Sequence, residues 1–321
     1  MPKSDELPPL SYKAVSSKDS SSKEDFYKKT LARLDKIQSH LETAPRSSRL
    51  KGKVCIITGA GSLRGIGRAS AILWAHEGAK HLYLVDYDET NLPNLKSTIE
   101  GKYPDVKVTT LQGDASDENA IASLCKRALQ EEGRLDVFFA NAGVATASPL
   151  DSVTAEGFMN TMKINTLSCF LAIKHASAAM EKANPSRGKE YGGGSIILTA
   201  SVAGIRSGAG SVDYSASKAA VNSLAQVSAN QLARTDIRVN SICPGLIETG
   251  MTIATFDYAR SRGTAGKLGQ LNPMGRYAVA NEIANVALFL ASDESSYVNG
   301  QNWCVDGGLT STLPTIPGRW A

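Results

Sequence analysis

Short apolar runs alternate with longer amphipathic segments from about residue 53 to residue 305. The runs hold consecutive Val, Ile, Leu or Phe residues instead of strictly alternating apolar and polar ones, which indicates strands buried on both faces. Such strands form parallel sheets covered by helices. The runs are KVCIIT, HLYLVD, VKVTTLQG, LDVFFAN, GSIILTA, IRVNSICP and QNWCV. The pattern predicts an α/β fold: a Rossmann-type doubly wound, seven-stranded parallel sheet in a single domain with an N-terminal extension.

The segment before the first strand has a helical pattern. Five apolar residues within positions 24–43 fall on one helical face, and they are Tyr27, Leu31, Leu34, Ile37 and Leu41. We expect this helix to dock on the domain or on a neighbouring subunit. A helix on a membrane surface is the less favoured alternative, because the polar face mixes acidic with basic residues.

The composition along the chain suggests four parts. Residues 1–22 are rich in Ser, Lys and Pro and predict a disordered tail. Residues 23–50 hold the helical extension and a linker, residues 51–312 form the Rossmann-type domain, and residues 313–321 are a C-terminal tail.

Composition and charge narrow the classes of function. Of 321 residues, 42% are hydrophobic and 21% charged, which is typical of a soluble protein. No apolar run approaches the ~20 residues of a membrane span, and the first residues lack a signal-peptide core, so a cytoplasmic location is expected. The net charge of +4 comes without clustered basic and aromatic residues, which argues against nucleic-acid binding. No metal site is expected, because the four histidines and five cysteines are scattered, and the cysteines suggest buried free thiols.

The first predicted strand runs into a Gly-rich stretch, VCIITGAGSLRGIGRASA, at residues 54–71. A strand, a Gly-rich turn and a helix start form a pyrophosphate site, since glycines let the backbone approach phosphates and a helix N-terminus offers free N–H groups. The second strand ends in Asp86, nineteen residues after Gly67. An acid at that place accepts hydrogen bonds from an adenosine ribose. A solvated Asp at a strand end is the alternative interpretation.

From about residue 51 to residue 309 the chain resembles the short-chain dehydrogenase/reductase family. The glycine-rich loop of that family usually has the form TGxxxGxG. Here five residues instead of three separate TG at positions 58–59 from GIG at positions 65–67. Because TGAGS and GIGRA each match, Leu63 and Arg64 form a two-residue insertion.

The resemblance bears on the choice of cofactor at two positions. A basic residue before the second glycine often marks family members that use NADP, and Arg64 stands there. An acid at the end of the second strand implies NAD, because a carboxylate repels a 2′-phosphate, and Asp86 stands there. We expect NAD as the cofactor, with NADP as the alternative.

Further segments match the cofactor site of the family. Asp114 in GDASD would hold the adenine amino group, Asn141 in FANAGV would brace the sheet, and Gly143 would pass close to the cofactor. A plain strand-to-turn role is the alternative for NAG. Ile247 and Thr249 in CPGLIET would touch the nicotinamide carboxamide. The cofactor residues implied by the resemblance are Thr58, Gly59, Gly61, Ser62, Arg64, Gly65, Ile66, Gly67, Asp86, Asp114, Ala115, Asn141, Ala142, Gly143, Tyr214, Lys218, Pro244, Gly245, Ile247 and Thr249.

Tyr214 and Lys218 are four residues apart in SVDYSASKAAV, which puts both side chains on one face of a helix. A phenol is a poor base near neutral pH, and a neighbouring ammonium favours the phenolate. The pair therefore suggests an acid/base couple, with an ordinary exposed Tyr–Lys pair as the alternative. The resemblance adds Ser201, which would hold the substrate oxygen, and Asn165, which would position a water linking Lys218 to solvent. Together these four are the expected catalytic residues.

The resemblance implies hydride transfer between a nicotinamide cofactor and a carbonyl or alcohol carbon, with no metal. The candidate substrate-pocket segments, residues 144–148, 205–210 and 251–256, are mostly small or apolar. The last of them lies in a long segment, residues 250–275, that is typical of a lid. We expect a secondary alcohol or ketone on a largely apolar scaffold, as in polyketide, steroid, terpenoid or fatty-acyl metabolism.

The C-terminal stretch DESSYVNGQNWCVDGG resembles the family segment that packs against a second subunit, which implies a homotetramer or homodimer. Two other functions stay open. One is an NADP-dependent 3-oxoacyl reductase. The other is a nucleotide-binding regulatory protein without turnover, which the intact set of four catalytic residues disfavours.

Overall fold

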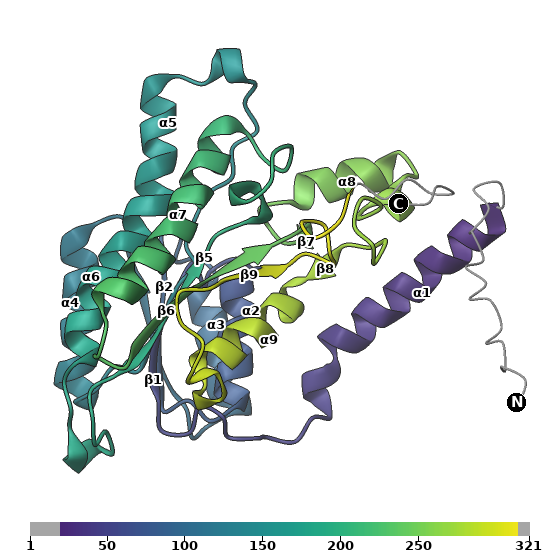
Figure 1. The fold of residues 1–321 in the computed structure, drawn as a ribbon. Helices are drawn as coiled ribbons and strands as arrows, with labels where there is room; N and C mark the ends of the chain where they lie inside the picture. The colour runs from purple at the N-terminus through teal and green to yellow at the C-terminus, as the bar shows by residue number, and fades with distance from the viewer. Residues whose placement is uncertain (1–19, 314–321) are drawn as a thin grey trace, which may run out of the picture.

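The computed structural model describes residues 20–313 of the chain, an alternation of strands and helices (Figure 1). The elements of the main sheet and its covering helices are β1 (Val54–Thr58), α2 (Ile66–His76), β2 (His81–Asp86), α3 (Leu92–Lys102), β3 (Lys107–Gln112), α4 (Glu118–Glu132), β4 (Val137–Ala140), α5 (Ala155–Met162), α6 (Ser168–Met180), β5 (Gly194–Thr199), α7 (Val212–Gln231), β6 (Ile237–Pro244), α9 (Ala280–Ala291) and β9 (Asn302–Val305).

The seven strands form one parallel sheet in the order β3-β2-β1-β4-β5-β6-β9. Helices α2, α3 and α9 cover one face, and α4, α6 and α7 cover the other. All seven strands lie where the apolar runs predicted them. The predicted doubly wound α/β fold in a single domain is confirmed.

The central strands are largely apolar because each face of the sheet carries a hydrophobic core, whereas the edge strands β3 and β9 are only partly buried. Along β1, Cys55 and Ile57 belong to the core under α2, α3 and α9, whereas Val54 and Ile56 belong to the core under α4, α6 and α7. Successive residues of a strand point to opposite faces. A run of consecutive apolar residues is therefore what a doubly covered strand requires.

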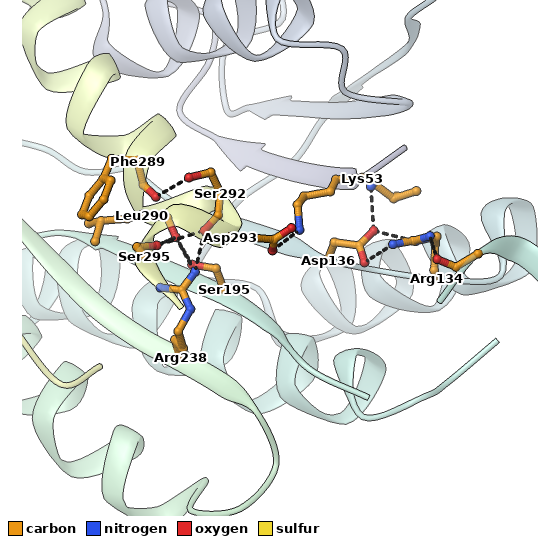
Figure 2. A network of polar contacts seen from close by, with 12 residues as sticks. Lys53, Arg134, Asp136, Ser195, Arg238, Phe289, Leu290, Ser292, Asp293 and Ser295 are labelled. Carbon is orange, nitrogen blue, oxygen red and sulfur yellow. Dashed lines mark hydrogen bonds and ion pairs between the residues drawn. The ribbon is translucent and has the colours of Figure 1, made fainter. Parts of the chain in front are cut away.

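The amino edge of the sheet is closed by polar contacts. The carbonyl oxygen of Leu290, in the last turn of α9, accepts hydrogen bonds from Ser195 Oγ and from Arg238 Nη2, each at 2.7 Å. Further along, Asp136 Oδ2 accepts the backbone N–H of Val54 at 2.8 Å, and the same carboxylate pairs with Arg134 (Figure 2). These contacts satisfy backbone groups that a helix end and a strand start leave unpaired.

The opposite, carboxyl edge holds the crevice of the fold. From β1 the chain adds β2 and β3 on one side and then β4, β5, β6 and β9 on the other. After β1 the chain leads to α2 on one face of the sheet, and after β4 it leads to α6 on the other face. Open α/β sheets bind ligands at the carboxyl ends of two such adjacent strands.

The N-terminal helix α1 (Ser20–Gln38) packs on the domain beside the lid segment. Leu34 is buried against Phe256, Tyr277 and Val279. The helix begins at Ser20, within the segment expected to be disordered, and residues 1–19 of that segment lie outside the described residues. Leu31 was expected on the buried face but is exposed, because the docked face is centred on Leu34.

The segment predicted as a lid contains a helix, α8 (Ile253–Ser261). It is flanked by two very short paired strands, β7 (Ile247–Glu248) and β8 (Ala278–Val279). The sequence pattern did not predict these strands, because two residues are too few for a periodicity. They fix the start and end of the lid segment against each other.

Two other expectations concern single features. Four of the five cysteines are buried free thiols as expected, but Cys304 is exposed because it lies on β9, the edge strand of the sheet. Within residues 20–313, no helix is both long enough and apolar enough to cross a membrane.

Candidate functional site

The glycine-rich loop packs tightly against the loop after β4. Gly59 has a φ of 71°, and a Cβ there would lie 2.8 Å from Ala142 Cα. A Cβ on Gly67 would collide with the carbonyl oxygen of Gly59. Only glycine fits the first position without strain, because left-handed backbone disfavours side chains. The two loops that flank the crevice are thus held together by contacts that leave no room for side chains.

The two-residue insertion projects from this loop. Gly65 is the N-cap of α2, and its N–H donates to the carbonyl oxygen of Ser62 at 2.9 Å. Leu63 and Arg64 between them are exposed, and Arg64 Nη1 lies 3.1 Å from Glu248 Oε1. The helix begins at Ile66, and the N–H groups of its first turn have no acceptor within the helix, as a site for an anion requires.

Asp86 lies at the end of β2 directly beside the glycine-rich loop. Its Oδ2 accepts the backbone N–H of Gly61 at 2.6 Å, and its Oδ1 accepts that of Asp88 at 3.0 Å. Each carboxylate oxygen can accept a further hydrogen bond. The residue therefore fits a ribose with two hydroxyl donors, whereas a phosphate on that ribose would meet a fixed negative charge.

Asp114 and Ala115 follow β3 at the same edge of the sheet. Asp114 Oδ1 accepts from the backbone N–H of Ser116 at 2.8 Å and from its hydroxyl at 2.7 Å. Partial burial works against ionisation, but the hydrogen bonds from Ser116 outweigh it and leave the pKa of Asp114 below its ordinary value. The carboxylate is thus charged and fixed in direction.

Asn141 joins three strand ends. Its Nδ2 donates to the carbonyl oxygen of Gly59 at 3.0 Å, and its Oδ1 accepts from Thr199 Oγ1 at 3.1 Å. Its backbone N–H donates to Thr58 Oγ1 at 3.1 Å. The side chain therefore links the ends of β1, β4 and β5, as a bracing residue would.

Asn165 lies in a π-helical turn, Lys163–Leu167, between α5 and α6. It is fully buried, and its amide pairs with the backbone of Val144: Oδ1 accepts the N–H at 2.8 Å and Nδ2 donates to the carbonyl at 3.0 Å. Nδ2 also lies 3.0 Å from Ser217 Oγ on α7. A single π turn inside a helix is common at functional sites, and here it brings the amide to the loop after β4.

Tyr214 and Lys218 lie one turn apart on α7, as the spacing predicted. Lys218 is buried, its Nζ donates to the carbonyl oxygen of Thr199 at 2.8 Å, and it lies 5.7 Å from the centre of the Tyr214 ring. A Cβ on Gly143 would lie 3.3 Å from Lys218 Nζ and 3.0 Å from Asn165 Oδ1. The absence of a side chain at Gly143 thus leaves space where the amide and the ammonium meet.

Ser201 follows β5 and begins a 3₁₀ helix, Val202–Gly204. Its Oγ accepts the backbone N–H of Ala203 at 3.1 Å, so its own proton is available to another acceptor. A Cβ on Gly204 would lie 2.5 Å from the carbonyl carbon of Lys218. The Ser201 turn is therefore in direct backbone contact with the turn of α7 that carries the lysine.

Pro244, Gly245, Ile247 and Thr249 lie where β6 leads into β7. A Cβ on Gly245 would lie 2.8 Å from Asp306 Cα, so this turn packs against the segment after β9. Ile247 and Thr249 are buried, and the N–H of Thr249 donates to Thr252 Oγ1 at 3.0 Å. The turn between β6 and β7 and the residues after it are thus held by the segment after β9 and by Thr252.

Three residues of this neighbourhood were not singled out by the sequence: Thr199, Asp213 and Glu248. Asp213 is buried beside Tyr214 and accepts hydrogen bonds at 2.8 Å from Thr146 and from Thr161. Burial opposes its ionisation, but the hydroxyl donors prevail and lower its pKa to about 2. An Asp at the start of a helix usually remains solvated, and the sequence carries no signal that this one is buried.

The candidate pocket segments present apolar side chains. Val144, Ile205 and Met251 are all exposed although they are large and apolar. Phe256, at the end of the third segment, is instead fully buried under α1. It belongs to the packing of the lid and not to a pocket wall. Among residues 20–313, no group of three His, Cys, Asp or Glu side chains is placed to hold a metal ion.

Comparison with known proteins gives consistent matches along the domain. Residues 59–310 match the family model described as enoyl-(acyl carrier protein) reductase. Levodione reductase of Leifsonia aquatica is 37% identical over 273 residues, which covers 84% of this chain and 98% of the relative. The 3-oxoacyl-(acyl-carrier-protein) reductase FabG of Thermotoga maritima is 38% identical over 261 residues, which covers 81% of this chain and 99% of the relative.

A solved structure agrees with these matches. The crystal structure of levodione reductase superposes with a TM-score of 0.74 at 36% identity, covering 82% of this chain and 100% of that one. The family model matches residues from Gly59 onward, which include the six strands after β1 and all four catalytic candidates.

Proposed function

This chain belongs to the short-chain dehydrogenase/reductase family, and we propose that it interconverts a secondary alcohol and a ketone on a largely apolar small molecule with NAD(H). It is an oxidoreductase of this family acting on CH–OH groups. One observation carries the proposal. The Asn165 amide and the Lys218 ammonium both lie next to Gly143, where no side chain fills the space, and the ammonium also lies beside the Tyr214 ring.

A bound nicotinamide cofactor would supply or accept the hydride at the substrate carbon. In the direction of reduction Tyr214 gives its proton to the substrate oxygen, and in oxidation it takes that proton back. Ser201 donates a hydrogen bond to the same oxygen and stabilises its developing charge. Lys218 favours the phenolate and, with Asn165, carries the proton relay.

NAD is the proposed cofactor because Asp86 favours it, while Arg64, which would favour NADP, is paired with another residue. Asp86 already accepts the N–H of Gly61 at 2.6 Å, so its carboxylate is held in place against a 2′-phosphate. Arg64, the residue that would favour NADP, pairs with Glu248 at 3.1 Å. A guanidinium that neutralises a carboxylate is less available to a phosphate.

The apolar character of the substrate is supported by Val144, Ile205 and Met251, which expose large apolar side chains in the three candidate pocket segments. Burying such side chains against a ligand contributes about 25 cal/mol per Å² of apolar area. A 3-oxoacyl substrate used with NADP is the second candidate, and it rests on the likeness to the reductase from Thermotoga maritima.

We further propose a homotetramer or homodimer. Helices α5, α6 and α7 expose Met159, Phe170 and Val227, and large apolar side chains on the outer faces of helices occur at subunit contacts. Light scattering is expected to give two or four times the mass of 34.0 kDa. A monomer at micromolar concentration would contradict this.

The test of the proposed function is a panel of ketones and secondary alcohols assayed with both cofactors, beside direct titration of each cofactor. We expect NADH to bind more tightly than NADPH and an apolar ketone to be reduced. Tight NADH binding without turnover of any substrate would favour a regulatory protein. Turnover only with NADPH and a 3-oxoacyl thioester would favour the second candidate.

A further inference from the structure

Glu248 is the second residue of β7 and lies between Ile247 and Thr249, the two residues that would face the nicotinamide. Ile247 and Thr249 alternate with it along the chain, so in an extended segment its side chain points to the opposite side. Its side chain is only 12% exposed, although it carries a charge. A sheltered carboxylate needs partners, because unpaired burial of a charge is costly.

The partners of Glu248 come from two other segments of the site. Arg64 Nη1, from the insertion in the glycine-rich loop, lies 3.1 Å from Glu248 Oε1. Arg260 Nη2, from the lid helix α8, lies 2.5 Å from the same oxygen. One carboxylate oxygen thus joins the phosphate-binding loop, the nicotinamide-side strand and the lid.

Helix α1 shelters this junction. Glu248 and Arg260 line a hollow of ≈ 460 Å³ whose other wall is the Leu34 face of α1. Both also line a second hollow of ≈ 520 Å³, which includes Arg64 and Leu41. Neither hollow is lined by the catalytic candidates. Glu248 is withdrawn from water while Arg64 is 60% exposed, so salt screens its pair with Arg64 in part and its pair with the 39% exposed Arg260 less.

We propose that Glu248 is a positioning residue that couples the glycine-rich loop to the lid helix, and that Arg64 acts through Glu248 and not on the cofactor itself. This rests on the proposed function, since the loop and the strand are the parts that would hold the cofactor. This role would account for the insertion of Leu63 and Arg64, because the two added residues extend the loop as far as the carboxylate of Glu248 on β7. Cofactor binding orders the loop and thereby the lid.

A double-mutant cycle on cofactor binding tests the coupling. We expect Arg64→Gln and Glu248→Gln each to raise the Kd for NADH about fivefold or more, and the double variant to be no weaker than Glu248→Gln. The KM for substrate rises while kcat changes less, because Tyr214 and Lys218 are untouched. Asp257→Asn is the matched control, because Asp257 is the second acid on Arg260 at 3.2 Å but is 64% exposed, and the Kd should not change.

Two results of the cycle would overturn the proposal. If Arg64→Gln weakens NADH binding equally in the wild type and in the Glu248→Gln background, Arg64 contacts the cofactor directly. If Arg64→Gln weakens NADPH binding but not NADH binding, Arg64 serves a 2′-phosphate. Arg64→Lys should recover part of the affinity only where Glu248 is present.

Hydrogen exchange gives a second readout that needs no cofactor. In the free protein, Glu248→Gln should speed amide exchange in α8 (Ile253–Ser261) and in the loop at residues 60–65, whereas Asp257→Asn should not affect the loop. Unchanged exchange in both segments would overturn the coupling. Failure of the wild type to bind either cofactor would instead overturn the proposed function, so the two failures are distinguishable.

Discussion

Lys218 illustrates how single side chains define the site. Its ammonium has three N–H donors, and one of them reaches the carbonyl oxygen of Thr199 at 2.8 Å. Among residues 20–313 the carbonyl of Thr199 is the one acceptor of this ammonium, so two of its N–H donors remain, which under the proposed function would serve ribose hydroxyls and a water of the proton relay. The hydrogen bond to Thr199 thus fixes the Lys218 side chain in place beside the Tyr214 ring.

Asp86→Ala is expected to reduce the preference for NAD over NADP. The substitution removes a charged acceptor from the ribose, and hydrogen bonds to charged groups contribute about 1.5–3 kcal/mol. The ratio of kcat/KM for NAD to that for NADP should therefore fall by roughly 10- to 100-fold. Steady-state kinetics with both cofactors measures it.

The neighbouring Asp88 is the control for that experiment. It is exposed and its carboxylate accepts from Thr90 at 2.9 Å. Asp88→Asn should leave the cofactor ratio as it is. A ratio unchanged by Asp86→Ala, or changed equally by Asp88→Asn, would remove Asp86 as the determinant.

At the scale of elements, the sequence predicts what is periodic and misses what is not. The central strands are predictable because doubly covered strands are continuously apolar, and the edge strands β3 and β9 still carry short apolar runs. The short β7 and β8 and the π turn around Asn165 are not, because each spans only two to five residues and depends on contacts with distant segments. The catalytic spacing on α7 is local and therefore predictable, whereas the roles of Thr199 and Glu248 depend on partners far away in the chain.

Helix α1 gives a prediction at this scale. Leu34 is 4% exposed and packs against Phe256 on α8, so Leu34→Ala leaves a cavity between the two helices. Removing a buried Leu side chain costs about 2–5 kcal/mol. Because α1 contacts the domain on one side only, we expect Leu34→Ala to lower the free energy of unfolding, measured in urea, by about 2 kcal/mol. Amide exchange in α1 and α8 should become faster.

Leu31 is the matched control on the same helix. It is 42% exposed, and Leu31→Ala should change the free energy of unfolding by less than about 0.5 kcal/mol. Equal effects of the two substitutions would mean that α1 does not dock through the Leu34 face. If amide exchange in α8 is the same in Leu34→Ala as in Leu31→Ala, the packing of Leu34 does not stabilise the lid helix.

At the scale of the whole molecule, a buried cluster far from the site makes stability depend on pH. His81 is buried, with Nδ1 2.9 Å from Glu132 Oε1, and burial lowers its pKa. Burial also opposes ionisation of Glu132, but hydrogen bonds from Lys80, His81 and Lys107 prevail and lower its pKa to about 2. Both groups bind fewer protons in the folded state than in the unfolded state.

The free energy of unfolding should therefore fall as the pH is lowered. The His81 contribution begins to be lost below its unfolded pKa of ~6.5, and the Glu132 contribution is lost between ~4.3 and about 2. Glu132→Gln should flatten the slope of stability against pH below ~4.3, as measured by urea unfolding at several pH values. The exposed Glu294→Gln should leave the slope unchanged, and an unchanged slope in Glu132→Gln would contradict the assignment.

The central claim is that Tyr214 exchanges the proton with the substrate oxygen, and single-turnover oxidation of NADH by a ketone in Tyr214→Phe tests it most directly. The account predicts that NADH binds with nearly the wild-type Kd while the rate falls by about 10²–10⁴. A rate within a few-fold of the wild type, with the same Kd, would contradict it.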